Sequence, residues 1–401
     1  MKKPLRSLAL ALLLLNTGHA AESPLVIFDK FWSTASDNIH PKSLAETHFT
    51  PERYKQLRQR AKNTTDVHEL TPIFNEFLSS LNVSHSRFYD DESVDFYFFR
   101  SLFDTRDPAT PVVNHIGAQF IQLDTRYVVR EVLSGYPAER AGVRRGDVIV
   151  AAGDGPFHPF RTFNPSGIRA QLTVERNGTR TQKLITAVAE NPNLSLQKAI
   201  TNSVRNFERE GRNIGYVRLW SGTGSEHLES FRSAIEKDLI DSDAIVLDLR
   251  GGFGGAWYEY LDPFFEDRSS YFSFAVENRE GVQSFDADPV DAHIYYAGPM
   301  VVLINEGTRS GKEGLAYQFK TSGRATLVGT TTAGAFSAGR GMFNDSELPY
   351  FLLIAAAEYT LDGTKVEGVG ISPDVEVSYP LDKGLASDPQ LEAALDLAAD
   401  M

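Results

Sequence analysis

The sequence has 401 residues, of which 42% are hydrophobic and 23% charged, a globular composition that allows two or three domains and a large buried core. Its net charge of −13 disfavours nucleic acid and anionic membrane surfaces as general partners. The chain contains no cysteine, which excludes disulfides, a thiol nucleophile and thiolate metal ligands.

Residues 1–20 have the organisation of a signal peptide. A basic start is followed by an apolar run from Leu8 to Leu15 and by Gly18 and Ala20, the small residues that a signal peptidase inspects. A membrane anchor is the alternative, but about eight apolar residues are too few to cross a hydrocarbon core of about 30 Å as a helix. We expect cleavage after Ala20, a mature net charge of about −16, no stable membrane insertion, and a periplasmic or secreted location.

Residues 21–111 are expected to form a helical N-terminal region. Between Leu70 and Leu81, apolar residues recur at the spacing of one helix face, and this helix is expected to end near Asn82. A polar turn that carries Ser84 and His85 follows directly. An imidazole in such a turn can project into a cleft, although a lone histidine is more often structural than catalytic.

Residues 112–190 change to short β-rich runs separated by Gly, Pro and Asp, which predicts a small β-rich module. Its segment SGYPAERAGVRRGDVI resembles the matching segment of PDZ domains. Such domains accept an extended peptide as an added strand and hold its terminal carboxylate in a backbone loop. By this resemblance the peptide-binding residues are Ile116, Gly117, Ala118, Gln119 and Phe120. His115 stands where that loop often has a glycine, which would alter the strength or selectivity of tail binding.

Residues 191–385 alternate strand-length apolar runs with turns and helical stretches, which predicts an α/β domain. The clearest strands are NIGYVRLW, AIVLDL and MVVLIN. The polar and aromatic segment 269–299 has no assignment. Residues 386–401 are expected to form a C-terminal helical tail.

A cluster of glycines follows the second of these strands in LDLRGGFGGAW: Gly251, Gly252, Gly254 and Gly255. A bare backbone can present N–H groups to a ligand oxygen, as in an oxyanion hole. A tight turn that requires positive φ is an equally good interpretation.

Ser310 lies at the expected start of a helix, after the strand MVVLIN and a glycine-containing turn. A serine there is exposed, and an anion formed by its attack would lie near the N–H of Gly311 and the positive end of the helix. Spacing alone favours the alternative, an N-capping serine with Glu313 completing a capping box. Glu367, in KVEGVGISPDVEV, would by itself be a solvated surface residue.

The other histidines show no repeated ligand spacing, and the sequence has neither an HExxH motif nor a Cys/His cluster. We therefore expect no metal site and no cofactor.

Taken in order, these segments resemble the C-terminal processing (tail-specific) serine protease family, whose members carry a PDZ domain. The strongest block runs from Asn305 to Ala335 and contains GTRSGKEGLAYQFKTSGRATLVGTTTAGA. The resemblance covers most of the expected mature chain. It implies a crotonase-like α/β catalytic core with an inserted PDZ-like β-rich domain and a helical N-terminal region.

The resemblance also implies the chemistry, with Ser310 as the nucleophile. One branch of the family takes its base from a lysine, but that position is Ala335 here, and Lys312 is expected to be a solvated charge. The other branch includes the tricorn core and the interphotoreceptor-retinoid-binding-protein-like modules. It uses an upstream Ser-His pair and a late glutamate before a G-x-G-x-x-P-D turn, which Ser84–His85 and Glu367 match.

In that scheme His85 accepts the Ser310 proton and returns it to the leaving amine. Glu367 orients the imidazole, with Ser84 between the two. The tetrahedral oxyanion would be bound by backbone N–H groups of Gly254 or Gly255 and of Gly311.

We therefore expect a serine-type endopeptidase that hydrolyses peptide bonds of proteins or peptides captured through their C-terminal tails, with homo-oligomer formation left open. The main alternative is a non-catalytic ligand- or peptide-binding protein on the same scaffold. A PDZ adaptor that presents tails to another protease and an esterase for a non-peptide acyl group are further alternatives.

Overall fold

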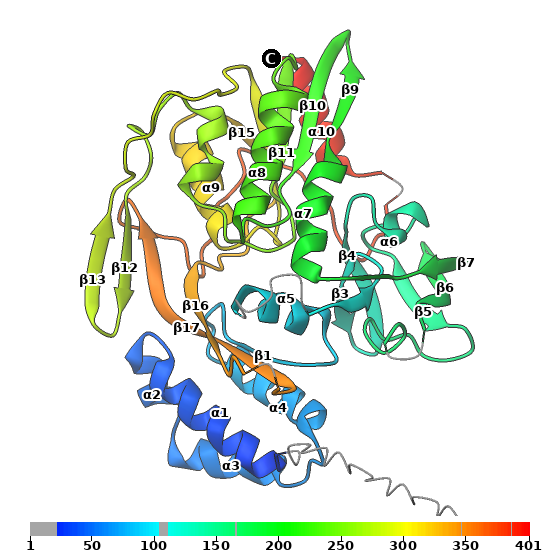
Figure 1. Ribbon diagram of the computed structural model, residues 1–401, viewed down its shortest axis with the longest axis vertical. Helices are drawn as coiled ribbons and strands as arrows, with labels where there is room; N and C mark the ends of the chain where they lie inside the picture. Colours follow the sequence, from blue (N-terminus) through cyan, green and yellow to red (C-terminus); the bar gives the residue numbers. More distant parts are fainter. Residues whose placement is uncertain (1–21, 104–110, 165–166, 346, 386) are drawn as a thin grey trace, which may run out of the picture.

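The computed structural model describes residues 22–103, 111–164, 167–345, 347–385 and 387–401 (Figure 1). It has the α/β fold class that the sequence predicts, with several sheets and helices. The predicted signal peptide lies outside the described residues. Within the described part, no helix has the length and apolarity needed to cross a membrane.

Four helices open the described chain: α1 (Pro24–Asn38), α2 (Lys42–His48), α3 (Pro51–Ala61) and α4 (Val67–Ser79). They enclose an aromatic core in which the rings of Phe31 and Phe74 stack with centroids 4.0 Å apart. Helix α4 corresponds to the apolar spacing between Leu70 and Leu81. The region is not purely helical, because β1 (Arg87–Asp90) follows the Ser84–His85 turn and pairs with a strand near the C-terminus. Helix α5 (Val94–Phe103) comes next.

A five-stranded antiparallel sheet follows, with the order β3-β4-β5-β6-β7. Its elements are β3 (Ala118–Leu123), β4 (Arg126–Val132), the short helix α6 (Pro137–Arg140), β5 (Val148–Ala152), β6 (Arg169–Arg176) and β7 (Thr179–Thr186). This sheet has its own apolar core, which includes Val129, Phe163 and Leu172. The strands β2 (Val113–His115) and β8 (Val188–Glu190) pair with each other where the chain enters and leaves this sheet.

The central sheet has the order β19-β15-β14-β11-β10-β9 and is parallel except at β9. Its strands are β9 (Arg205–Arg209), β10 (Arg212–Arg218), β11 (Ala244–Asp248), β14 (Met300–Ile304), β15 (Thr326–Gly329) and β19 (Val375–Glu376). Strands β11 and β14 are buried along their whole length, which explains their uninterrupted apolar sequences.

Helices cover both faces of this central sheet (Figure 1). Helices α7 (Pro192–Ser203), α8 (Ser225–Ser233) and α9 (Gly311–Thr321) contribute to the larger core, while α10 (Pro389–Ala399) packs on the opposite face. A π-helical turn, Ala234–Leu239, continues α8. Two 3-10 turns, Tyr258–Tyr260 and Asp262–Phe264, follow β11.

Strand β17 (Tyr350–Leu361) joins the N-terminal region to the rest of the fold. It pairs with β1, with β12 (Phe274–Asn278), with β16 (Ser337–Met342) and with β18 (Thr364–Lys365). The hairpin of β12 and β13 (Gly281–Phe285) occupies part of segment 269–299, which the sequence left unassigned. Through β17, the turn that carries Ser84 and His85 is held against the C-terminal half of the chain.

Candidate active site

Ser310 ends a tight turn between β14 and α9. The turn is closed by hydrogen bonds from the Asn305 N–H to Thr308 Oγ1 (3.1 Å) and from the Thr308 N–H to the Asn305 carbonyl (2.9 Å). The backbone of Ser310 has φ 55° and ψ −135°. This left-handed conformation costs a non-glycine residue roughly 1–3 kcal/mol and occurs preferentially at functional sites.

Ser310 is the N-cap residue of α9, as the alternative interpretation of the sequence requires, and the Glu313 carboxylate accepts its N–H at 3.1 Å in a capping-box arrangement. Yet its backbone differs from that of other N-caps in the chain, such as Thr50, Asp66 and Asn191, which are all extended. An N-cap normally has extended backbone angles. Capping alone therefore does not explain the strained conformation of Ser310.

Glu313 does more than cap the helix. Its buried carboxylate accepts hydrogen bonds from Thr332 Oγ1 (2.6 Å), the Gly334 N–H (2.7 Å) and the Ala335 N–H (2.8 Å). The Ser310 N–H in turn donates to the Ala335 carbonyl at 2.9 Å. Burial raises the pKa of Glu313. Glu313 thus fixes loop 332–335 against Ser310, a positioning role that the capping-box spacing did not reveal.

The glycine-rich turn after β11 lies directly against Ser310. A Cβ added at Gly254 would clash with Ser310 Cβ and lie 2.9 Å from its Oγ. Within the described part of the chain, the N–H groups of Gly254 and Gly255 donate no hydrogen bond. They remain available to an oxygen in the cavity that both residues line.

The two preceding glycines fit the tight-turn interpretation instead. Gly251 and Gly252 have φ of 55° and 65°, and the Gly251 N–H donates to Asn305 Oδ1 at 3.2 Å. Gly311 allows the start of α9 to approach the turn, because a Cβ there would overlap the Ala256 carbonyl oxygen.

Glu367, Ser84 and His85 form one hydrogen-bonded chain. Ser84 Oγ lies 2.8 Å from Glu367 Oε2 and 2.7 Å from His85 Nδ1, and the Ser84 N–H donates to Glu367 Oε1 at 2.7 Å. These three residues are therefore adjacent in the fold, although 283 positions separate Ser84 from Glu367. In the sequence, only a family resemblance connects them.

The Glu367 carboxylate also binds the start of β16. Its Oε2 accepts the N–H groups of Phe336 (2.5 Å) and Ser337 (2.8 Å). Only 7% of the Glu367 surface is exposed, so the prediction of a solvated residue from its local sequence alone is wrong. The carboxylate ties the Ser84 turn to the loop that Glu313 holds against Ser310.

His85 is held neutral by its surroundings. Burial of the ring, reinforced by the positive charge of Arg309 and opposed by Glu367, lowers the pKa of His85 to about 4. Its backbone, like that of Ser310, is left-handed, with φ 52°. At neutral pH the imidazole is thus a proton acceptor.

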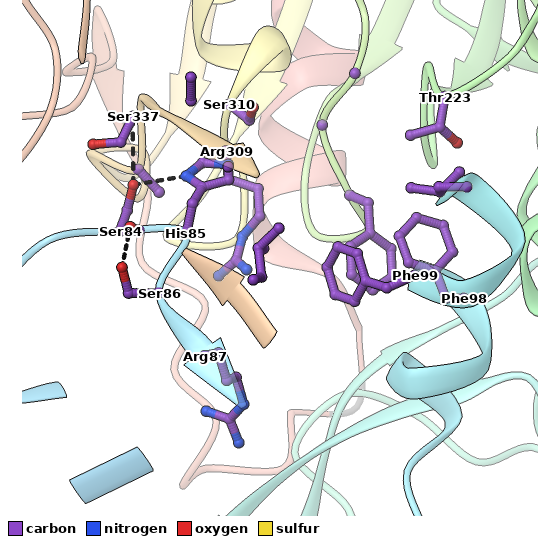
Figure 2. A pocket seen from close by; sticks show the side chains of 18 of the residues that line it. Ser84, His85, Ser86, Arg87, Phe98, Phe99, Thr223, Arg309, Ser310 and Ser337 are labelled. Atoms are coloured by element: carbon purple, nitrogen blue, oxygen red, sulfur yellow. Dashed lines mark hydrogen bonds between the residues drawn. The ribbon is translucent and has the colours of Figure 1, made fainter. Parts of the chain in front are cut away.

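One cavity of about 490 Å³ contains both sides of the site. Its lining includes Ser84, His85, Gly254, Gly255 and Ser310. Figure 2 shows the hydrogen bond between Ser84 and His85, with Ser310 on the opposite side of the imidazole ring. No hydrogen bond joins the side chains of His85 and Ser310, both of which the structure describes.

Lys312 is not a solvated charge, and that prediction is wrong. The residue is fully buried, and its Nζ donates to the carbonyls of Leu219 (3.2 Å) and Gly251. Burial lowers the pKa of Lys312 well below its usual value. The Lys312 side chain points from α9 toward the glycine-rich turn after β11. The local sequence does not indicate that this side of the helix is buried.

The predicted peptide-binding residues lie at the edge of the five-stranded sheet. Ile116 is buried in its core, and the Gly117 N–H donates to His115 Nδ1 at 3.1 Å. Ala118, Gln119 and Phe120 belong to β3, whose outer edge has no partner strand among the described residues. His115 Nε2 lies 3.0 Å from Ser195 Oγ, so this loop is also tied to α7.

No group of three or more His, Asp or Glu side chains in the described ranges has the arrangement of a metal site.

Comparisons with known proteins place the chain in a family. Residues 213–377 match the model of peptidase family S41. Over 323 residues the chain is 30% identical to the carboxy-terminal-processing protease of Bartonella bacilliformis, an alignment that covers 77% of this chain and 69% of that protein. The chain belongs to this family. The prediction from the sequence is thereby confirmed, and the family consists of serine-type peptidases.

Two further comparisons extend this result. The carboxyl-terminal-processing protease of Synechocystis sp. is 28% identical over 277 residues, which are 66% of this chain and 63% of that relative, so the chain spans just under two thirds of its length. The solved structure of a photosystem II D1 C-terminal processing protease aligns with 94% of this chain and 98% of its own at a TM-score of 0.54 and 20% identity. The fold of the S41 peptidases is therefore shared over almost the whole chain.

Proposed function

We propose that the chain is an exported serine endopeptidase that cleaves peptide bonds of protein substrates through an acyl-enzyme on Ser310. The observation that carries this proposal is the chain of hydrogen bonds from Glu367 through Ser84 to His85, in the same cavity as Ser310. A base oriented by a carboxylate next to a serine on a strained turn is what peptide hydrolysis by serine requires.

The hydrogen bonds support one tautomer of His85. The Ser84 hydroxyl donates to Glu367, so its oxygen accepts the proton on His85 Nδ1. Nε2 then carries a lone pair and can take the Ser310 proton as the hydroxyl attacks the substrate carbonyl. The imidazolium formed in this step is stabilised through Ser84 by the charge of Glu367.

The oxyanion has donors on the other side of Ser310. The N–H groups of Gly254 or Gly255, together with that of Gly311 at the start of α9, would stabilise the tetrahedral intermediate. The missing hydrogen bond between His85 and Ser310 is compatible with this role, because catalytic hydrogen bonds often tighten only when substrate binds.

Substrate capture is assigned to the PDZ-like sheet, residues 112–190. The edge strand β3 can accept an extended peptide by strand addition. The Gly117 N–H is already bonded to His115, so a terminal carboxylate bound there would have to displace the imidazole or use neighbouring donors. The proposed boundaries of the other parts are 21–111 for the N-terminal region, 191–385 for the crotonase-like core and 386–401 for the C-terminal tail.

A non-catalytic binding protein is the second candidate. Two observations favour it. Phe98, Phe99 and Phe253 make part of the cavity lining aromatic, and no hydrogen bond joins the described side chains of His85 and Ser310. The two candidates differ in whether Ser310 is activated.

A fluorophosphonate probe separates them, because it reacts with an activated serine and does not require the natural substrate. The mature chain, from Ala21 onward, should be labelled, and the label should be lost in Ser310→Ala and reduced at least about a hundredfold in rate in His85→Ala. Ser33→Ala, which removes an exposed hydroxyl on α1 far along the chain from the site, is the matched control and should label like the parent. Labelling that survives Ser310→Ala would overturn the assignment of the nucleophile. A folded parent that remains unlabelled even with unfolded protein present would be a binding protein.

A further inference from the structure

Two arginines line the active-site cavity in addition to the residues of the proposed mechanism. Arg309 directly precedes Ser310, and Arg87 follows His85 by two positions. In Figure 2 both side chains extend to the same side of His85. They come from distant parts of the chain and line the same cavity.

Neither arginine has a partner for its charge. Within the described residues, the side chains of Arg87 and Arg309 form no ion pair and no hydrogen bond, and the Nε atom of Arg309 is buried without an acceptor. The Arg87 guanidinium lies over the ring of Tyr89, 5.8 Å from its centroid. Three other buried arginines, Arg145, Arg218 and Arg250, are paired with carboxylates. Arg87 is exposed, so the cost of a buried guanidinium atom without an acceptor falls on Arg309, whose buried Nε calls for a specific explanation such as a ligand.

The surroundings leave this wall positive. Arg130 lies behind Arg309 and repels it, and its own Nε is also buried without an acceptor. Asp95 is the carboxylate near all three arginines, but it forms no ion pair with any of them. The carboxylate of Glu313 also lies near Arg309, so three positive charges face two carboxylates in a protein whose net charge is −13.

The opposite part of the lining is apolar. Phe98, Phe99, Leu102, Phe103 and Phe253 line the same cavity. A ligand with one anionic group and apolar atoms fits such a lining, because guanidinium groups bind carboxylates through paired hydrogen bonds while aromatic rings bury apolar surface.

We propose that Arg87 and Arg309 form a subsite for a peptide carboxylate next to the scissile bond. This proposal rests on the function proposed above and adds a substrate class to it. The carboxylate is either the C-terminus of the substrate or an Asp or Glu side chain near the cleaved bond. Cleavage would then occur within a few residues of that negative charge.

The test uses three pools of random hexapeptides: one with free C-terminal acids, one with C-terminal amides, and one of amides with a fixed internal Glu. The random positions of all three pools exclude Asp and Glu, so the plain amide pool carries no carboxylate, and each pool competes with the fluorophosphonate probe for Ser310 of the mature chain. At least one carboxylate-bearing pool should protect Ser310 at about a tenfold lower concentration than the plain amide pool, as one charged hydrogen-bonded contact predicts. Protection by the free-acid pool identifies a C-terminus, and protection by the Glu pool identifies an acidic side chain.

The variants Arg87→Gln and Arg309→Gln should abolish the preference, while Arg309→Lys should restore part of it. Arg53→Gln removes an exposed arginine on α3 and is the matched control, which should keep the full preference. Equal protection by all three pools in the parent would overturn the proposal. A preference that survives in both arginine variants would do the same, because the carboxylate would then bind elsewhere, for example at β3.

A failure of the proposed function can be told apart from a failure of this subsite. If Ser310 of the parent does not react with the probe, binding of the same pools, labelled with fluorescein, is measured on Ser310→Ala by fluorescence anisotropy. The subsite then predicts tighter binding of a carboxylate-bearing pool and its loss in Ser310→Ala with Arg87→Gln. Equal binding of all pools in that background would refute the subsite independently of catalysis.

Discussion

The two sides of the candidate site are built in different ways. The nucleophile side consists of Ser310, Glu313 and Gly254, all within the segment that matches the peptidase family S41 model, residues 213–377. The base side consists of Ser84, His85 and Glu367, and its first two members lie far outside that segment. The nucleophile side is fixed by a tight turn between adjacent elements, whereas the base side exists only after distant segments meet. The position of Ser310 therefore depends on local chain geometry, whereas the position of His85 depends on tertiary packing.

The largest expected effect comes from removing the carboxylate of the base side. Glu367→Ala leaves the hydroxyl of Ser84 and the N–H groups of Ser84, Phe336 and Ser337 without their acceptor. We expect kcat/KM for a peptide substrate to fall about a thousandfold, and the free energy of unfolding in urea to fall by about 3 kcal/mol. Glu376→Ala, at an exposed glutamate in β19, should change neither. Near-parental activity of Glu367→Ala would show that His85 needs no carboxylate.

A single methyl group added at Gly254, on the nucleophile side, should lower kcat. Gly254→Ala adds a Cβ against Ser310 Cβ and Oγ, in a backbone conformation that alanine can adopt, so its effect is steric. We expect kcat to fall about a hundredfold, because displacement of the nucleophile or of an oxyanion donor costs that much.

The control for this change is Gly155→Ala, where the nearest atom to the added Cβ is 3.8 Å away. That variant should retain full activity. If Gly254→Ala is equally active, the turn after β11 is not in contact with the reacting atoms.

Removing the bridging hydroxyl should have a smaller effect. Ser84→Ala breaks the link between Glu367 and His85 but keeps the Ser84 N–H bond to the carboxylate. We expect kcat to fall roughly tenfold to a hundredfold with little change in KM, and Ser84→Thr to recover most of the loss. An unchanged kcat in Ser84→Ala would mean that the hydroxyl is not part of the path to His85.

The smallest expected effect is on the pH dependence of the base side. Because the pKa of His85 is about 4, kcat/KM should fall on the acid side with a midpoint near that value and not near the ordinary 6.5. The free energy of unfolding should also fall as the pH is lowered, for the same reason. Between pH 6.5 and about 4, His85 is protonated in the unfolded chain but not in the folded chain, so the free energy of unfolding falls as the pH falls. The difference in urea midpoint between the parent and His85→Gln should depend on pH in this window. A midpoint for kcat/KM near 6.5 would contradict the buried, neutral imidazole.

The sequence predicts the nucleophile side better than the base side. The strand, turn and helix around Ser310 follow from one contiguous pattern, and its neighbour Gly254 stands in a visible glycine cluster. His85 and Glu367 have no such signal, since each is unremarkable in its own segment. Only the resemblance to a family with a Ser-His pair and a late glutamate singled them out.

Other errors have the same physical cause. Lys312 was expected in solvent because helical spacing does not say which face of α9 lies under the Gly251 turn. The sequence predicts a helical region over 21–111, yet β1 pairs with β17 across 260 or more positions. Glu313 matched a capping box, but its bonds to Thr332, Gly334 and Ala335 depend on a loop that only the folded chain brings near. Local patterns do not encode contacts of this kind.

In the proposed mechanism, the long separation between Ser84 and Glu367 also determines when the chain can become active. Synthesis proceeds from the N-terminus, so Ser84 and His85 emerge early, while Glu367 and the turn that carries it emerge near the end. A chain that stops between Ser310 and Glu367 has both the serine and the histidine, but it lacks the carboxylate that joins their segments. Under that mechanism, activity has to wait until the chain has been made as far as Glu367 and has folded, which would protect the producing cell from a peptidase that starts to work too soon.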